Sequence, residues 1–431
     1  MRGVEGEMRI AVTGVGMVSP LGKNVEQSWQ RLIAGESGIE SVDYPPSSVT
    51  VAAHVNDFDP REDLSGLPRR VNPKRVARAA QFALKASNEA LKDAGLLTEE
   101  GAIDERHVNR REMGVIFGTG MGGGLRIADV DRAVQEGKLG SGYNIMAILS
   151  GRTATTISQM HGLRGVSYAP EGECATGGIS IQAGINEILV GNARKMIVGS
   201  AEGSIDARAL ALFESAGTLS LEPDPLQASR PFDEDRGGFV MGEGAGALIL
   251  ELWEDAVARG VEPYAEIIGC KSTNDGDSAH ETDPTGEGAM DALVLAFRGL
   301  DGILREGRPI FVSAHATATR QGDPVEGQVL SDFFSPYGIE VFTHNPKGAT
   351  GHELGASGAI EAVFLLKTLR TGTVPPNLNV TKPIPQVERL QIIRPTAVHN
   401  PDIRTGVNNA FGFGGICNVT VFEYKPAPRE V

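Results

Sequence analysis

The sequence predicts an α/β protein built from two similar halves, and two observations support this prediction. The motif EGECATGG at 171–178 returns in altered form as PKGATGHE at 346–353. With an offset of 174 positions, these motifs and the helical patterns behind them share five identities, beginning with Ala175 and Ala349. The 431 residues also exceed what one hydrophobic core usually fills.

Strands and helices alternate along the first half. IAVTGVGM at 10–17 predicts a buried strand ending in glycine, and VEQSWQRLIAG at 25–35 predicts a helix. In RVARAAQFALKASNEALKDAG at 75–95, apolar residues recur every three or four positions before a terminating glycine, which indicates another helix. GVIFGTG predicts the next strand, short amphipathic stretches follow between 107 and 165, and ARKMIVGSAEG at 193–203 predicts a further strand. Such alternation is typical of layered α/β folds.

Each copy of the repeat predicts a strand, a turn and a buried helix. VSYA at 166–169 and VFT at 341–343 lead into glycine-containing turns and then into helical patterns rich in small residues. The turns carry different chemistry, Cys174 in the first copy and Lys347 with His352 in the second. We infer that a duplicated fold divides one active site between its halves.

The chain divides into three units. We expect a flexible N-terminal extension over 1–7, a first half over 8–258 that carries the thiol, and a second half over 259–431 that carries the histidines and the lysine. The segment 221–239 is rich in proline and charge and predicts a surface loop, while YAEIIGCKS at 264–272 opens the second half with another buried strand.

Composition excludes several classes of function. With 55 acidic and 40 basic residues the net charge is −15, which argues against general nucleic-acid binding. Cys174, Cys270 and Cys417 are scattered without a CxxC, so neither a disulfide framework nor a metal site is indicated. The first residues, MRGVEGEMRI, lack the apolar core typical of a signal peptide, and no stretch approaches the roughly 20 apolar residues of a membrane span. We therefore expect a cytoplasmic protein without a membrane or nucleic-acid partner.

Two glycine-rich stretches do not predict a nucleotide site. TGVGMVSPLG departs from the GxGxxG spacing of dinucleotide loops, and GTGMGGG at 118–124 lacks the Lys-Ser/Thr of a phosphate-binding P-loop. Close backbone packing is the better interpretation of these glycines.

Four residues are candidates for chemistry: Cys174, His315, Lys347 and His352. A cysteine between a strand and a helix is often a small buried filler. At a helix N-terminus, however, free amides and the helix dipole favour thiolate, so we expect a lowered pKa and an activated nucleophile. Either histidine alone could cap a turn, but both stand at strand-to-loop exits of the half opposite the thiol, which favours one shared site.

Longer motifs resemble a known family. HATATRQGD, PKGATGHELGASGAIE and NNAFGFGG are similar to the three C-terminal signatures of the β-ketoacyl-acyl-carrier-protein synthases, most of all the type II elongating enzymes of fatty-acid synthesis. AVTGVGMVSPLG, SWQRLIAGESGI, ASRPFDEDRGGFVMGEGAGALILE and VPPNLNV resemble further family segments in the family order. The resemblance extends from about Met8 to Tyr424.

This resemblance implies a thiolase-like fold, with two duplicated halves in an αβαβα layered arrangement and usually a homodimer. Thiolases are similar in fold, but their second catalytic cysteine stands in a CxGGG context. Here Cys417 follows GFGGI, so a thiolase is a poor alternative.

The implied reaction is a decarboxylative Claisen condensation. Cys174 would take the acyl group from a carrier-protein thioester, and malonyl carrier protein would then lose carbon dioxide. His315 and His352 would stabilise the enolate by hydrogen bonding to the thioester carbonyl, and the carbanion would attack the acyl-enzyme. Lys347, with Glu361 nearby, would orient and electrostatically support the histidines. No cofactor is implied beyond the phosphopantetheine on which acyl carrier protein presents the substrates.

The resemblance also implies a set of binding residues around the nucleophile. The backbone amides of Cys174 and Phe413 would form the oxyanion hole, and Phe413 would also act as a gate. Thr317 and Thr319 match positions that contact the phosphopantetheine arm, and Asp323 in the same motif is a supporting residue.

Further positions concern specificity and docking. Met121 and Phe213 match residues that line the acyl pocket of the family. Lys74, Arg75 and Arg78 form a basic cluster where the family docks its acidic carrier protein, although a solvated helix face explains these charges equally well.

Three residues depart from the family pattern. Glu171 and Glu173 replace the small or hydroxylic residues that usually precede the nucleophile, and Ala316 replaces the glycine after the first catalytic histidine. Carboxylates facing the sulfur would raise its pKa and weaken acylation. Alternatively, they point to a partner or to a basic residue.

Two other functions stay open at this point. One is a ketosynthase or acyltransferase of polyketide or secondary metabolism, which the unusual Glu171–Glu173 turn makes credible. The other is a non-elongating subunit similar to chain-length factors, although such subunits typically lose the cysteine that is present here as Cys174.

Overall fold

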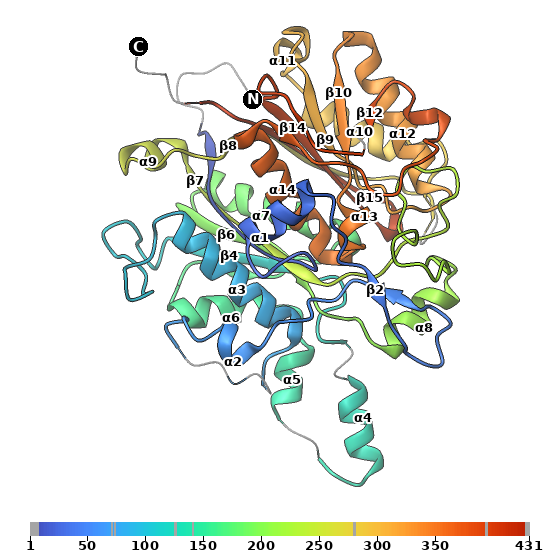
Figure 1. Cartoon of the computed structure of the whole chain (residues 1–431). Coiled ribbons are helices and arrows are strands. Elements are labelled where there is room, and N and C mark those ends of the chain that lie inside the picture. The colour runs from blue at the N-terminus through green and yellow to red at the C-terminus, as the bar shows by residue number, and fades with distance from the viewer. Residues whose placement is uncertain are drawn as a thin grey trace.

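A mixed sheet forms the framework of the protein, and its strands fall into two sets (Figure 1). The computed structural model describes residues 8–69, 72, 75–124, 127–139, 142–278, 282–392 and 395–426. The extension expected over 1–7 lies outside the described residues.

The first set holds five strands. In spatial order they are β1 (Ile10–Val18), β7 (Gly244–Leu252), β6 (Lys195–Glu202), β4 (Met113–Gly118) and β5 (Ser167–Tyr168). The β1–β7 and β7–β6 pairs are antiparallel, whereas the β6–β4 and β4–β5 pairs are parallel.

The second set repeats this topology. Its order is β8 (Ala265–Asn274), β15 (Ile416–Glu423), β14 (Thr405–Gly412), β9 (Ile310–Ser313) and β10 (Val341–His344), with β12 (Gln391–Ile392) added at the edge. Two antiparallel pairs are again followed by two parallel pairs. The predicted duplication is therefore present in the topology, and a short antiparallel contact between β1 and β8 joins the sets.

Helices cover both sets of strands and separate them. The described helices are α1 (Val25–Ile33), α2 (Pro60–Asp63), α3 (Arg78–Asp93), α4 (Ile127–Gln135), α5 (Tyr143–Ile148), α6 (Arg152–His161), α7 (Thr176–Leu189), α8 (Ala207–Ser215), α9 (Trp253–Ala258), α10 (Glu287–Ala296), α11 (Asp301–Arg305), α12 (Gly322–Phe334), α13 (Lys347–Thr350) and α14 (Ser357–Thr371). Helices α3 and α6 pack on the first set, and α10 packs on β8 and β15. Helices α7 and α14 touch each other and strands of both sets, so they form the central layer of an αβαβα arrangement.

Small residues let the two central helices approach closely at their N-termini. A Cβ atom at Gly177 would lie 2.3 Å from the backbone nitrogen of Ala359, and one at Gly358 would lie 3.1 Å from the backbone nitrogen of Gly178. Both distances are shorter than an ordinary contact, so glycine is required at this crossing. The turns that precede both helices meet here.

The offset chosen from the sequence is wrong, although the repeat is real. Helices α7 and α14 begin at Thr176 and Ser357, 181 positions apart, so Ala175 corresponds to Ala356 and not to Ala349. The residues before them, Glu173 and Leu354, share a positive φ of 51° and 49°. The second copy carries the additional short helix α13 between its strand and this turn, and an alignment on the Ala-Thr-Gly letters cannot detect it.

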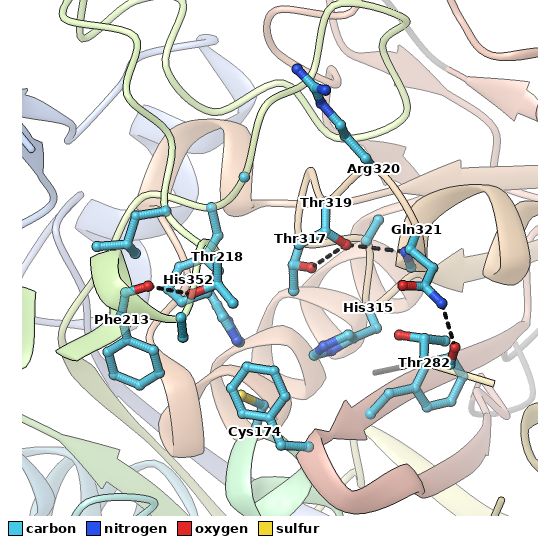
Figure 2. Close-up of a pocket in the computed structure, with 18 of the residues that line it drawn as sticks. Cys174, Phe213, Thr218, Thr282, His315, Thr317, Thr319, Arg320, Gln321 and His352 are labelled. Carbon is cyan, nitrogen blue, oxygen red and sulfur yellow. Dashed lines mark hydrogen bonds between the residues drawn. The ribbon is translucent and has the colours of Figure 1, made fainter. Parts of the chain in front are cut away.

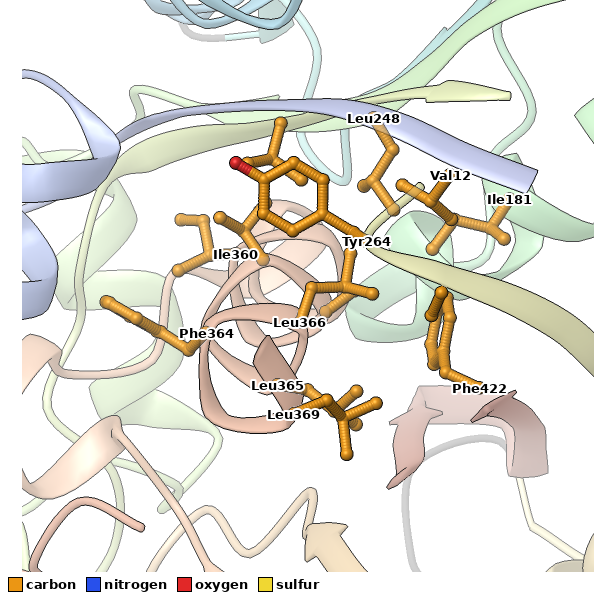
Figure 3. Packing of buried hydrophobic residues seen from close by; sticks show 14 of the residues in the cluster. Val12, Ile181, Leu248, Tyr264, Ile360, Phe364, Leu365, Leu366, Leu369 and Phe422 are labelled. Atoms are coloured by element: carbon orange, nitrogen blue, oxygen red, sulfur yellow. The ribbon is translucent and has the colours of Figure 1, made fainter. Parts of the chain in front are cut away.

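The main hydrophobic core surrounds α14. Ile360 and Leu366 of this helix pack with Leu248 of β7, and Phe422 of β15 closes the opposite side (Figure 3). All four side chains are essentially inaccessible to solvent. Helix α14 is apolar on nearly all sides, as expected for a helix enclosed between two sheets.

Helices α4 and α5 extend away from the layered body (Figure 1). Their surface and the loop that follows α5 expose the apolar side chains of Ile127, Val134, Ile145, Met146 and Leu149. Neither these helices nor any other described helix has the length and apolar character to cross a membrane.

Candidate active site

Cys174 lies in a tight turn between β5 and α7. The 3₁₀ turn Glu173–Ala175 runs directly into the helix, and the Thr176 hydroxyl donates to the Glu173 carbonyl at 2.7 Å. A Cβ atom at Gly172 would lie 2.1 Å from the end of the Ile179 side chain, so a larger residue there would have to displace that side chain. The Cys174 side chain is 9% exposed and reaches a cavity.

This cavity has a volume of about 1300 Å³ and brings together residues from both halves. Figure 2 shows Cys174 at one end, with the imidazoles of His315 and His352 directed toward it. The predicted residues that line the cavity are Met121, Cys174, Phe213, His315, Thr317, Thr319, His352 and Phe413. The shared site inferred from the repeat is therefore present in the geometry.

His315 follows β9 and is held by its backbone. The amides of His315 and Ala316 donate to the two oxygens of Glu326 at 2.8 and 2.7 Å, and Asn345 donates to the His315 carbonyl at 2.9 Å. Ala316 adopts a φ of 20° in this turn, a value at which glycine would be unstrained. The turn nevertheless accommodates the methyl group of Ala316.

His352 follows α13 and is held by a backbone hydrogen bond and by contacts with two aromatic rings. Its amide donates to the Val240 carbonyl at 2.7 Å, and Nδ1 lies 2.9 Å from the Ser357 hydroxyl. The His352 ring meets Phe239 and His315 edge to face, with centroid separations of 5.1 and 5.5 Å. The two imidazoles thus face the same small volume above Cys174.

Both imidazoles are neutral near pH 7. Burial, reinforced by the positive charge of Lys347, holds the pKa values of His315 and His352 well below the ordinary 6.5. A neutral imidazole that carries its proton on the nitrogen facing the cavity donates a hydrogen bond without adding a positive charge.

Lys347 lies behind the histidines and outside the cavity wall. It is 1% exposed, and its Nζ donates to the His315 carbonyl at 2.6 Å and pairs with Glu361. Burial raises the pKa of Glu361 to about 7, against the charge of Lys347, which lowers it. Lys347 therefore fixes the His315 turn and brings a positive charge close to the cavity.

The expected lowering of the Cys174 pKa is wrong. Burial raises the pKa of this thiol to about 12; the charge of Lys347 lowers it, and those of Glu173, Glu202 and Glu361 raise it further. The end of α7 favours the thiolate, but removal of the sulfur from water outweighs this effect. Cys174 is a thiol until a substrate or base changes its surroundings.

The two unexpected acids do not line the cavity. Glu171 and Glu173 are exposed on the outer side of the turn, although the charge of Glu173 contributes to the raised Cys174 pKa. The backbone before Phe413 packs against the inner side, because a Cβ atom at Gly412 would lie 2.7 Å from the Gly172 carbonyl. The backbone of Gly412 and the Cys174 turn are thus adjacent, as an oxyanion hole between them requires.

The loop after His315 forms one wall of the cavity. Residues 315 to 319 alternate between partly exposed and buried side chains, and the Thr317 and Thr319 hydroxyls lie 3.3 Å apart. Asp323 does not touch the histidines; it accepts from the Thr319 amide at 3.2 Å and from the Phe232 amide at 2.8 Å. Burial raises the pKa of Asp323 to about 7.

The basic cluster expected to dock a carrier protein is only partly available. Lys74 lies outside the described residues. The Arg78 guanidinium pairs with buried Glu243 at 2.6 Å and lies over the Phe82 ring, while its side chain stays 38% exposed. Arg75 lies over the Tyr143 ring of α5 at 4.0 Å.

Sequence reasoning missed several residues that hold the site. They are Glu326 and Asn345 behind His315, Phe239, Glu353 and Ser357 beside His352, and Glu202, which accepts from the Gly120 and Met121 amides at 3.1 Å each. Glu326 follows the motif HATATRQGD by three residues, but nothing in the sequence distinguishes it from an ordinary helical glutamate. Within the described residues, no group of His, Cys, Asp and Glu side chains is arranged to hold a metal.

Comparison with known proteins assigns this architecture to a family. Residues 7–256 match the family model of the β-ketoacyl synthase N-terminal domain, and residues 264–381 match that of the C-terminal domain. This chain belongs to the β-ketoacyl synthase family. The division placed at 258 stays a prediction, since the models bracket it without testing it.

Individual β-ketoacyl synthases are similar over nearly the whole chain. The mitochondrial 3-oxoacyl-[acyl-carrier-protein] synthase of Arabidopsis thaliana is 37% identical, with 94% of this chain and 91% of the relative covered. The 3-oxoacyl-[acyl-carrier-protein] synthase 2 of Vibrio harveyi is 34% identical, with coverages of 96% and 98%. The solved β-ketoacyl synthase from Burkholderia phymatum STM815 is 29% identical with a TM-score of 0.85, covering 97% of this chain and 100% of that one. Together with the repeated topology, this confirms the thiolase-like fold.

Proposed function

We propose that this protein is a 3-oxoacyl-[acyl-carrier-protein] synthase that condenses a Cys174-bound acyl chain with malonyl carrier protein in fatty-acid elongation. The observation that carries the proposal is the arrangement of one thiol and two neutral imidazoles in a single cavity between the halves. The ring centroids of the two imidazoles lie 5.5 Å apart. The names of the curated relatives support the same activity.

The first half-reaction transfers the acyl group. The Cys174 sulfur attacks the acyl thioester, the bond to the pantetheine sulfur breaks, and the thiol proton passes to that leaving sulfur. Because the pKa of Cys174 is raised, the proton is still on the sulfur when the attack begins and leaves it during this step. The amides of Cys174 and Phe413 hold the oxyanion of the tetrahedral intermediate.

The second half-reaction forms the new carbon–carbon bond. The malonyl carboxylate leaves as carbon dioxide, and its electron pair passes into an enolate on the thioester. His315 and His352 donate to the enolate oxygen from the cavity side. The enolate carbon attacks the Cys174 thioester, the carbon–sulfur bond breaks, and Cys174 regains a proton. No cofactor is required, because decarboxylation itself supplies the carbanion.

The cavity offers side chains that suit both the phosphopantetheine arm and the acyl chain. Thr317 and Thr319 lie on the side of the cavity away from Cys174, and Arg320 extends beyond them at the outer end of the cavity (Figure 2). Hydroxyls suit the amides of a pantetheine arm, and a guanidinium suits its phosphate. Met121 and Phe213 belong to the apolar surroundings of Cys174 and set the length of the acyl chain.

A second copy of this chain is the proposed partner besides acyl carrier protein. The exposed apolar residues of α4 and α5 and the unpaired edge strand β5, with Tyr168 37% exposed, form surfaces that a second copy would cover. A cytoplasmic homodimer is our proposal, and its mass in solution tests it: a value near 45.5 kDa would contradict it, and twice that value is expected.

Mixing the protein with acyl carrier proteins of different chain lengths, followed by malonyl carrier protein, tests the activity. We expect an acyl adduct on Cys174 that disappears as 3-oxoacyl product forms. A product only from polyketide-type substrates would favour secondary metabolism. An absence of both adduct and product would favour a non-elongating subunit.

A further inference from the structure

His352 is backed by two residues that the proposed reaction does not yet use. Its Nδ1 lies 2.9 Å from the Ser357 hydroxyl, which lies 2.9 Å from Glu353 Oε2. His352 is 1% exposed, and Ser357 and Glu353 are fully buried. The chain from Glu353 through Ser357 to His352 is therefore shielded from water.

We propose that Glu353, as a neutral carboxylic acid, and Ser357 hold His352 in the tautomer that decarboxylation requires. This inference rests on the proposed function, in which His352 donates to the enolate oxygen. The two residues are positioning residues, since they act through His352 and reach no substrate.

Counting protons shows why the charge of Glu353 matters. The Ser357 hydroxyl has one proton, and the described residues supply it with no partners besides His352 and Glu353. If Glu353 is ionised, that proton points to the carboxylate, so His352 carries its own proton on Nδ1 and presents a bare Nε2 to the cavity. A bare nitrogen cannot donate to the enolate.

Protonation of Glu353 reverses the direction of both hydrogen bonds. The carboxylic acid donates to Ser357, Ser357 donates to His352 Nδ1, and the His352 proton stands on Nε2. No net proton is gained by the imidazole, so it stays neutral, as its burial requires. The tautomer competent for enolate stabilisation is thus coupled to one buried carboxyl group.

The surroundings favour the neutral acid. Oε1 of Glu353 has no hydrogen-bond partner among the described residues, and the nearby Thr350 hydroxyl bonds to the Pro346 and Gly351 carbonyls instead. An ionised carboxylate with one bare oxygen is costly inside a protein. Burial raises the pKa of Glu353, and this effect outweighs those of the nearby Thr350 hydroxyl and of the charge of Lys347, which lower it.

Several charged groups lie on the elements packed around this site. They are Lys347 on α13, Glu361 on α14, Glu202 on β6, and the Glu243–Arg78 pair beside Gly242. Lys347 is already paired with Glu361, so it offers Glu353 no direct counter-ion.

The tautomer can be measured in the free enzyme by nitrogen-15 NMR of labelled histidine, with His352 assigned through His352→Gln. At the acid end of the pH range in which the protein stays folded we expect a bare Nδ1 and a protonated Nε2, and we expect a shift toward the opposite tautomer as pH rises through the raised pKa of Glu353. Glu353→Gln keeps a neutral hydrogen-bond donor, so it should hold the Nε2 tautomer at every pH. A wild-type His352 that carries its proton on Nδ1 at every pH would overturn the proposal.

Decarboxylation of malonyl carrier protein gives an independent readout. The wild-type rate should fall as pH rises through a Glu353 pKa above the ordinary 4.5, because ionised Glu353 selects the wrong tautomer. The rate of Glu353→Gln should not fall in that range, which separates Glu353 from Glu361, whose pKa is about 7. A fall that is equal in both proteins would refute the inference.

Ser357→Ala breaks the chain without adding bulk. We expect the decarboxylation rate to drop on the order of 100-fold, the size of losing one oxyanion donor. Ser331→Ala is the matched control, since Ser331 is a buried serine that bonds to the Gln386 carbonyl, away from the cavity. Acylation of Cys174 in the same variants reports the proposed function separately, so the two ideas can fail independently. Equal rates for the two alanine variants would contradict the relay.

Discussion

Replacement of Lys347 by methionine tests whether the buried ion pair holds the site together. Lys347 is 1% exposed and bonds to both the His315 carbonyl and Glu361, which is itself fully buried. Methionine fills similar space but leaves Glu361 without its counter-ion. Removing one partner of a buried pair costs about 3–5 kcal/mol where the remaining group stays charged and uncompensated, which for Glu361 is the case above pH 7.

This cost can be converted into a melting temperature. The unfolding entropy is about 2.1 cal/mol/K per residue. If all 431 residues unfold cooperatively, each kcal/mol of lost stability therefore lowers Tm by about 1 °C. Lys347→Met should therefore lower Tm by about 3–5 °C in differential scanning calorimetry. The double variant Lys347→Met/Glu361→Met removes the stranded carboxylate as well, so it should recover most of that loss.

The pH dependence of the loss follows from Glu361. Its pKa in the folded protein is about 7, above the ordinary 4.5, so its contribution to stability is full below pH 4.5 and is lost as pH rises through about 7. Lys347 lowers this pKa, and its removal raises it further. The deficit of Lys347→Met relative to the wild type should therefore widen above pH 7. An unchanged Tm, or a double variant as unstable as the single one, would refute the reasoning.

Three further predictions concern the nucleophile and its pocket. Cys174→Ala should abolish the acyl-enzyme adduct seen by mass spectrometry while decarboxylation of malonyl carrier protein persists; undiminished condensation would disprove the assignment. Glu173→Ala should lower the Cys174 pKa and speed iodoacetamide alkylation at a given pH, whereas the control Glu171→Ala should not, because Glu171 is not among the charges that shift this thiol. Met121→Ala should shift the preferred acyl chain toward greater length in a carrier-protein panel, and an unchanged preference would exclude Met121 from the pocket end.

Periodicity was sufficient to locate most elements of the fold. The strand predicted at 10–17 coincides with β1, which is buried along its whole length, because a continuous apolar run between glycines indicates burial. The strand predicted at 264–272 coincides with β8, but only its first two residues are buried, so the expectation of a buried strand is wrong for the rest. The helix predicted over 75–95 spans Arg78–Asp93, so it begins three residues later than predicted. The repeat was found from two short motifs, but its true offset depends on α13, which inserts a turn without changing the local composition.

The residues of the site also fall into those that the sequence reveals and those that only the folded structure reveals. Cys174, His315, Lys347 and His352 have side chains whose chemistry is visible in the letters, and the structure brings them together. Glu326 and Ser357 act through backbone amides or a neighbouring ring, so only the folded geometry reveals them. The Cys174 pKa was misjudged because the sequence shows the helix end but not the depth of burial.

The most direct test of the account is intact-protein mass spectrometry with sequential substrates. The protein is mixed with an acyl carrier protein, examined for a Cys174 adduct, and then given malonyl carrier protein. The account predicts an adduct that disappears as 3-oxoacyl carrier protein appears. A folded protein that gives neither adduct nor product across a panel of chain lengths would contradict it.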